Sequence, residues 1–178
     1  PHKGHLAIIQ NVQKHIDFCL ILPTYSHRHK KESHTYFTNR FNSAQKHLTL
    51  KNPDVKNHVS QLEKDLCLWL ESKKQMAGLG STYSLINFIL TSLKKSQVKA
   101  SLYFICGQDN FTTLSTWYKG DQLIEKIKWI GFPRHHGKEE IPNWLLKNGN
   151  ILLTDFVHID VSSSEIRDNP NHPLAFLS

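Results

Sequence analysis

Near its start the chain carries two histidines on either side of a glycine, in the run His2, Lys3, Gly4 and His5. An apolar stretch follows directly, and the pattern predicts the start of a helix. The N–H groups at a helix N-terminus bind anions, and glycine allows the backbone to approach a ligand closely. With the imidazoles of His2 and His5 as further donors, these residues could hold a phosphate. The alternative is a surface helix start with two solvated histidines.

A second candidate phosphate site lies near the other end, where three serines precede a predicted helical turn. Ser162 and Glu165 have the spacing of a capping box. The same start presents the hydroxyls of Ser163 and Ser164 to an anion, and Arg167 could grip two phosphate oxygens with its planar guanidinium. Helix capping and phosphate binding are compatible here.

Other polar residues follow predicted strands. The basic cluster 28–31, which includes Lys30, comes after one strand, and Asp109 comes after another. A carboxylate at such a strand end can accept a hydrogen bond from a ribose hydroxyl. A solvated loop and a turn-forming aspartate are the simpler interpretations. Trp117 belongs either to the core or to a site for a flat ring.

The elements that must position these residues alternate along the chain. Apolar runs predict strands at 17–25, 57–62, 100–107, 127–134 and 150–157, and helical patterns cover the opening segment, 36–50, 82–95, 117–126 and 139–147. This alternation predicts one α/β domain over residues 1–178, Rossmann-like, with a parallel sheet and helices on both faces. Ligands of such sheets bind at the carboxyl ends of the strands. The segment 70–81 predicts a mobile loop.

Composition limits the classes of partner. A formal charge of +7 over 178 residues favours anionic ligands. No array of aromatic residues interleaves with the basic ones, so we do not predict a nucleic-acid binder. No apolar run approaches the roughly 20 residues of a membrane span.

The cysteines and histidines indicate the cellular compartment and bear on metal binding. The three cysteines lie far apart, which predicts free thiols and a cytoplasmic protein. The twelve histidines lack partnering cysteines or an HExxH pattern, so we do not predict a zinc site.

Five stretches together resemble one superfamily: "PHKGHL", "LPTYSHRHK", "STYSLINFI", "FICGQDNFTTLSTWYKGDQLI" and "DVSSSEIR". Their order and the motifs HxGH and SSxxR are similar to those of the nucleotidyltransferase superfamily. Within it the chain most resembles the bacterial nicotinate-nucleotide adenylyltransferases. The shared order along nearly the whole chain is more specific than any one stretch.

The resemblance implies an enzyme of NAD biosynthesis that joins ATP and nicotinate mononucleotide into deamido-NAD and pyrophosphate. Mg²⁺ would be bound mainly through the ATP phosphates. The implied catalytic residues are His2, His5, Lys30 and Arg167. The implied ATP-binding residues are His2, Gly4, His5, Asp109, Ser163, Ser164 and Arg167. The implied residues for the second substrate are Lys30, Thr82, Tyr83, Ser84, Trp117 and Arg134.

Two alternatives stay open beside this expectation. One is a sister transferase that acts on nicotinamide mononucleotide or phosphopantetheine, and the other is a non-catalytic nucleotide-binding module of the same fold. The resemblance also implies that the first strand of the family and its glycine-rich turn belong before Pro1, and that a closing helix belongs after Ser178. The segment 63–81 is longer than the usual link of the family.

Overall fold

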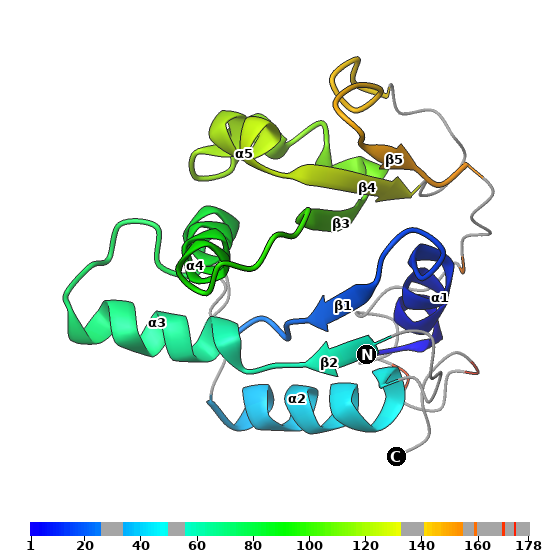
Figure 1. Ribbon diagram of the computed structural model, residues 1–178. Helices are drawn as coiled ribbons and strands as arrows, with labels where there is room; N and C mark the ends of the chain where they lie inside the picture. Colours follow the sequence, from blue (N-terminus) through cyan, green and yellow to red (C-terminus); the bar gives the residue numbers. More distant parts are fainter. Residues whose placement is uncertain are drawn as a thin grey trace. The chain divides into compact units, whose positions relative to one another are not determined.

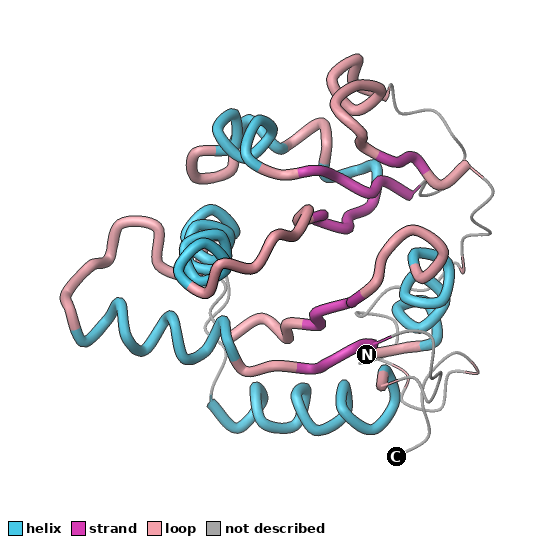
Figure 2. The backbone as a smooth tube through the Cα atoms, viewed as in Figure 1, coloured by secondary structure: helices cyan, strands magenta, loops and turns pink. Residues whose placement is uncertain are grey.

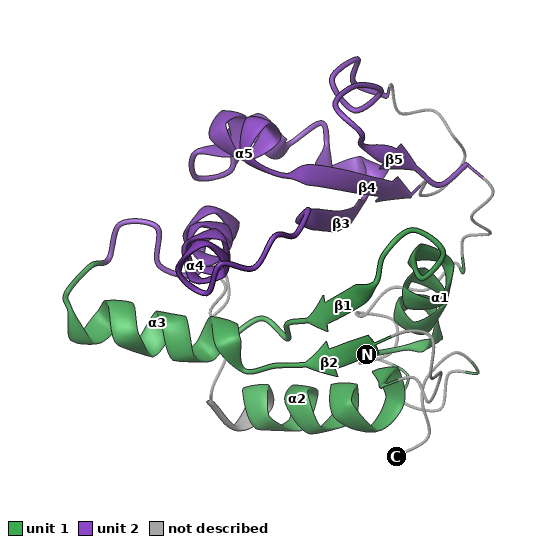
Figure 3. Cartoon of the chain, viewed as in Figure 1, with its two compact units in different colours: residues 1–75, 159–178 green, residues 76–158 purple. Residues whose placement is uncertain are grey.

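The computed structural model describes residues 1–25, 34–49, 56–132 and 141–154, together with 159, 169 and 173. The chain falls into two compact units (Figure 3). Unit 1 comprises Pro1–Gln75 with Ile159–Ser178, and unit 2 comprises Met76–His158. The expectation of a single domain stays a prediction.

Unit 1 is built around a parallel pair of strands. Its elements are α1 (Lys3–Val12), β1 (Phe18–Ile21), α2 (His34–Leu48), β2 (Lys56–Val59) and α3 (Leu62–Ser72) (Figure 1). The ladder runs from Phe18 opposite Lys56 to Ile21 opposite Val59. Parallel neighbours need a long crossover, and α2 supplies it between β1 and β2.

The core of unit 1 joins the first two helices to the strands. Ile9 of α1 packs with Ala44 and Leu48 of α2 and with Val59 of β2, and all four side chains are buried. Ala44 and Leu48 are four positions apart, which places them on one face of α2. This apolar contact fixes α1, and with it the residues at the start of α1.

Unit 2 contains a second parallel sheet, of three strands, in which β4 is central. Its elements are α4 (Thr82–Lys95), β3 (Tyr103–Gly107), α5 (Gly120–Lys126), β4 (Lys128–Phe132) and β5 (Ile151–Leu152), with 3₁₀ turns at Gln108–Asn110 and Leu114–Thr116. Figure 2 shows the strands in magenta. Parallel pairing in both units confirms the predicted parallel α/β class.

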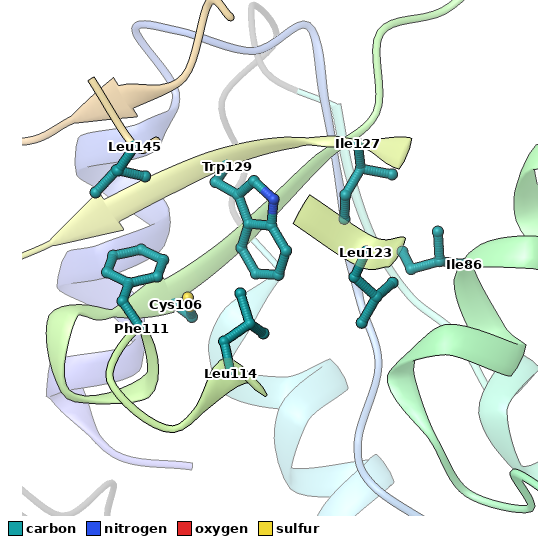
Figure 4. Packing of buried hydrophobic residues seen from close by; sticks show 8 residues of the cluster. All are labelled: Ile86, Cys106, Phe111, Leu114, Leu123, Ile127, Trp129 and Leu145. Carbon is teal, nitrogen blue, oxygen red and sulfur yellow. The ribbon is translucent and has the colours of Figure 1, made fainter. Parts of the chain in front are cut away.

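The core of unit 2 surrounds Trp129, which has no exposed surface. The ring of Trp129 packs edge to face against Phe104, Phe111 and Trp144, with centroid distances of 5.4, 6.2 and 5.7 Å. Figure 4 shows the buried cluster of Ile86, Cys106, Phe111, Leu114, Leu123, Ile127, Trp129 and Leu145. Leu114 and Phe111 belong to the turns after β3, so the core anchors those turns.

Several predicted elements differ from the structure, and helix α3 was not predicted at all. Residues 70–72 belong to α3 and not to a loop, because Leu66 and Leu70 continue its buried face. Residues 141–147 form turns and not a helix, as expected for Pro142, which lacks the N–H of a helix interior. Helix α5 begins at Gly120 and not at 117, because Lys119 adopts a left-handed conformation with φ 54°.

Gly120 yields the first testable prediction. A Cβ at this position would lie 1.8 Å from the carbonyl oxygen of Leu114. Backbone cannot move aside as a flexible side chain does, so we expect Gly120→Ala to lower the free energy of unfolding by about 1–3 kcal/mol. Urea denaturation measures the change. Ser115→Ala, at an exposed position in the 3₁₀ turn that contains Leu114, is the control. Equal urea midpoints for the two variants would contradict the steric argument.

Candidate active site

The two histidines of unit 1 meet at the first turn of α1. His2 is the N-cap, in extended conformation, and its backbone N–H donates to Nδ1 of His5 over 3.2 Å. The centroids of the two rings are 3.9 Å apart. His2 and the intervening Gly4 are buried, and His5 is partly exposed. The structure therefore brings together the three residues predicted from the HxGH motif and confirms that a helix starts there.

The hydrogen bond to His5 determines what its ring can offer a ligand. Because Nδ1 accepts a bond, the neutral imidazole carries its proton on Nε2. The first turn of α1 contains no acidic side chain. The positive end of the helix dipole thus lies beside a histidine donor, an arrangement suited to an anion.

Two further cations of unit 1, one on α2 and one at the start of α1, donate to backbone carbonyls. Arg40 of α2 donates to the carbonyl of Thr24, just beyond β1. Lys3 Nζ donates to the carbonyl of Pro173 over 2.8 Å, which ties the first turn of α1 to a residue near the end of the chain. Arg40 was not predicted from the sequence. The sequence could have indicated it, because Arg40 is the one arginine in α2, the helix that follows β1.

The predicted stretch Thr82–Ser84 forms the first turn of α4 in unit 2. Ser81 is the N-cap, and its Oγ accepts from the N–H of Ser84 over 3.2 Å. Ser84 Oγ donates to the carbonyl of Gly78 over 2.9 Å. The hydroxyl of Ser84 therefore secures the loop before the helix. The first N–H groups of a helix have no intrahelical acceptor, which leaves those of Thr82 and Tyr83 suited to an anionic ligand.

Tyr83 joins α4 to the segment around Tyr118. Its hydroxyl donates to Gln122 Oε1 over 2.8 Å, and its ring lies edge to face with that of Tyr118 at 5.9 Å. Hydrogen bonding with Asn87 lowers the pKa of the Tyr83 phenol, and the charge of Lys119 acts in the same direction. Tyr118 and Lys119 were not predicted as site residues, although they directly follow Trp117 in the sequence.

Asp109 and Trp117 occupy the two turns that follow β3. Asp109 lies in the 3₁₀ turn Gln108–Asn110, and its Oδ1 accepts from Asn110 Nδ2 over 3.2 Å. Trp117 is half-buried and packs edge to face against Phe104 of β3 with centroids 6.1 Å apart. Asp109 thus stands at the carboxyl end of a parallel strand, as predicted.

Five predicted site residues lie outside the described residues: Lys30, Arg134, Ser163, Ser164 and Arg167. Within the described ranges, no group of three or more His, Cys, Asp and Glu side chains could hold a metal ion. The helices in the same ranges are all too short or too polar to cross a membrane.

Comparison with known proteins places these features in context. A profile of the cytidylyltransferase-like family matches residues 1–169. The chain is 30% identical over 174 residues to a probable nicotinate-nucleotide adenylyltransferase of Pseudothermotoga lettingae, covering 94% of this chain and 78% of that protein. It is 28% identical over 172 residues to the nicotinate-nucleotide adenylyltransferase of Bacillus subtilis, again covering 94% of this chain and 78% of the relative.

A solved structure shares the fold. The nicotinic acid mononucleotide adenylyltransferase of Plasmodium falciparum, complexed with APC, superposes with a TM-score of 0.59 at 17% identity. The match covers 94% of this chain and 76% of that one. The predicted Rossmann-like nucleotidyltransferase fold is thereby confirmed.

The bond between His2 and His5 yields the second prediction. His5→Ala removes the acceptor of the His2 N–H, and we expect it to lower the free energy of unfolding by about 1 kcal/mol. Glutamine at the same helix position can accept that N–H in a capping box, so His5→Gln should retain wild-type stability. Thermal and urea denaturation of both variants provide the test. An unchanged midpoint for His5→Ala would show that the bond does not stabilise α1.

Proposed function

The chain belongs to the cytidylyltransferase-like family, and we propose that it transfers the adenylyl group of ATP to nicotinate mononucleotide, forming deamido-NAD and pyrophosphate. The observation that carries the proposal is the start of α1, where the bond from the His2 N–H to His5 Nδ1 brings two imidazoles and Gly4 together at the helix N-terminus. The named relatives support the choice of substrates.

The proposed reaction requires little acid–base chemistry from the protein. A phosphate oxygen of the mononucleotide attacks the α-phosphorus of ATP, a new P–O bond forms, and the bond to the β-phosphate breaks with release of pyrophosphate. A phosphate monoester has a second pKa near ~6 and is already anionic at neutral pH, so no general base is needed. Catalysis then depends on aligning two anions and on stabilising the charge that develops on pyrophosphate.

In unit 1 we assign the ATP phosphates to His2, Gly4 and His5. The imidazole donors and the N–H groups of α1 would stabilise the growing negative charge. Lys30 would reach the phosphates as a further cation. Ser163, Ser164 and Arg167 would bind the triphosphate, and the bond between Lys3 and Pro173 supports this because it brings a residue six positions after Arg167 to the start of α1.

In unit 2 we assign the ribose of ATP to the carboxylate of Asp109 and the pyridine ring to Trp117. The N–H groups at the start of α4, around Thr82 and Tyr83, would receive the carboxylate of nicotinate. Ser84 would maintain that turn through its bond to Gly78. Arg134 would add a cation after β4.

ATP enters this reaction as its magnesium complex. Mg²⁺ keeps most of its water and binds substrate phosphates through few protein carboxylates.

A cytoplasmic location accords with the proposal. Cys19, Cys67 and Cys106 are buried free thiols. Burial raises the pKa of the Cys19 thiol, which keeps it in the unreactive protonated form. Free thiols of this kind are typical of a reducing compartment.

The first test of the proposal uses the two His5 variants. We expect both His5→Ala and His5→Gln to lower turnover about a hundredfold, the order observed when one preorganised donor to a developing charge is lost. His5→Gln keeps the helix cap, so its loss would be chemical and not structural. Pyrophosphate release under saturating ATP and nicotinate mononucleotide measures turnover. Near-wild-type turnover of His5→Gln would exclude the assigned role.

The second test concerns the choice of mononucleotide. A carboxamide keeps one acceptor oxygen, but its uncharged NH₂ would face the second donor at the start of α4 and leave it unpaired. We therefore expect nicotinate mononucleotide to exceed nicotinamide mononucleotide at least about a hundredfold in kcat/KM. Indole stacking serves both rings equally, and Trp117→Ala should therefore weaken both substrates and keep the preference.

A coupled assay of pyrophosphate with ATP and each mononucleotide, or phosphopantetheine, decides among these substrates. Trp69→Ala, at a tryptophan that is 52% exposed on α3, is the matched control. Similar kcat/KM values for the acid and the amide would overturn the acid-specific assignment. ATP binding without turnover of any acceptor would indicate a non-catalytic module.

A further inference from the structure

In unit 2 a single lysine bridges two aromatic rings that come from different elements. Lys119 Nζ lies 4.9 Å from the ring centroid of Tyr83 on α4 and 5.6 Å from that of Tyr118 in the turn before α5. Ammonium groups within about 6 Å of a ring centroid are attracted by the negative face of the ring. The side chain of Lys119 therefore links the first turn of α4 to the residue that follows Trp117.

Lys119 is one of four non-glycine residues with positive φ in the described part of the chain, with Lys74, Gln97 and Asn148. The residue adopts the left-handed conformation, with φ 54° and ψ 39°, and is the N-cap of α5. Glycine and asparagine take up this conformation at lower cost. A strained lysine persists where the surrounding contacts hold it. The N–H of Leu123 donates to the carbonyl of Lys119 and holds this backbone, and the two rings hold the side chain.

Helices α4 and α5 have other connections that do not involve Lys119. Lys126 Nζ donates to Asn87 Oδ1 over 2.9 Å, and the Tyr83 hydroxyl donates to Gln122 Oε1 over 2.8 Å. Removing the ammonium of Lys119 should therefore leave the two helices joined. The change would be confined to the turn that carries Trp117 and Tyr118.

Backbone hydrogen bonds also stabilise the turn around Trp117. The N–H of Trp117 donates to the carbonyl of Leu114 over 3.0 Å, and the N–H of Gly120 donates to the carbonyl of Trp117 over 2.9 Å. These bonds fix the path of the chain but not its alignment with α4. The Tyr118 ring lies against Gly78 before α4 and edge to face with Tyr83, and Lys119 adds its charge to this alignment. Tyr83 keeps a second cation, because Lys126 Nζ lies 5.3 Å from its ring centroid.

We propose that Lys119 is a positioning residue: its ammonium, held over Tyr83 and Tyr118, aligns the Trp117 turn with the start of α4 and thereby sets the affinity for the pyridine ring of the mononucleotide. This inference rests on the proposed function, which places the ring at Trp117 and its carboxylate at α4. Lys119 touches neither the reacting phosphates nor the leaving group in this scheme. Its loss should change substrate binding and not the chemical step.

The experiment compares Lys119→Gln, Lys119→Arg and the control Lys128→Gln. Lys128 also lies over a tyrosine, with Nζ 5.4 Å from the ring centroid of Tyr103, so its variant removes the same charge from a similar contact. We expect Lys119→Gln to raise KM for nicotinate mononucleotide about fivefold, from the loss of cation–π attraction to two rings. The KM for ATP and kcat should stay within about twofold of wild type. Arginine also packs on aromatic faces and should restore KM.

A second readout needs no substrate. Amide hydrogen exchange of peptides that cover residues 114–120 reports opening of the turn. Exchange in Lys119→Gln should be at least about threefold faster than in wild type and in Lys128→Gln, because the turn loses one of its ties to α4. A rise in KM without faster exchange would mean that the charge acts directly on the substrate, which overturns the positioning role.

The outcomes separate this inference from the proposed function. If wild type turns over nicotinate mononucleotide and Lys119→Gln behaves like Lys128→Gln, the positioning role is wrong and the function stands. An equal rise in KM for ATP and for the mononucleotide would also overturn it, as a general electrostatic effect. If wild type turns over no mononucleotide, the proposed function fails, and the role of Lys119 in binding the ring fails with it.

Discussion

Parallel strand pairing is the constraint on which both units depend. Every strand pair in the described ranges is parallel, and parallel neighbours cannot be joined by a tight turn. The chain must therefore leave each strand at its carboxyl end and continue into a longer crossover segment. In unit 1, β1 leads to Thr24, whose carbonyl binds Arg40. In unit 2, β3 leads to Asp109. Polar residues gather at these ends because the backbone leaves the sheet there.

In unit 2 the packing around Trp129 extends this constraint to the turns. Phe111, two residues after Asp109, packs edge to face on Trp129. That contact requires Gly131 in the neighbouring strand, since a Cβ there would lie 2.7 Å from Phe111 Cε2. Phe104 contacts both Trp129 and Trp117. The apolar core thus determines where the carboxylate of Asp109 and the indole of Trp117 are held.

The histidines at the start of α1 combine a structural and a chemical role. Nδ1 of His5 accepts the His2 N–H and so takes part in starting the helix. The same bond places the proton on Nε2, the atom proposed to face phosphate. A residue that caps a helix is held in one orientation, and a donor held in one orientation loses little entropy when the ligand binds. Ser84, in contrast, has a structural role, because its hydroxyl donates to Gly78 and holds the loop before α4.

Local patterns in the sequence were sufficient to predict the parallel α/β class, the helix start at His2 and His5, helix α4 and the position of Asp109 after a strand. These features follow from periodicity, capping residues and short apolar runs, which act over a few residues. The pairing of Lys119 with Tyr83 and of Arg40 with Thr24 could not be predicted in this way. Their partners lie 36 and 16 positions away, and no local pattern specifies which distant side chains meet. Packing of the helices and strands brings them together, because apolar burial selects one arrangement of the whole unit.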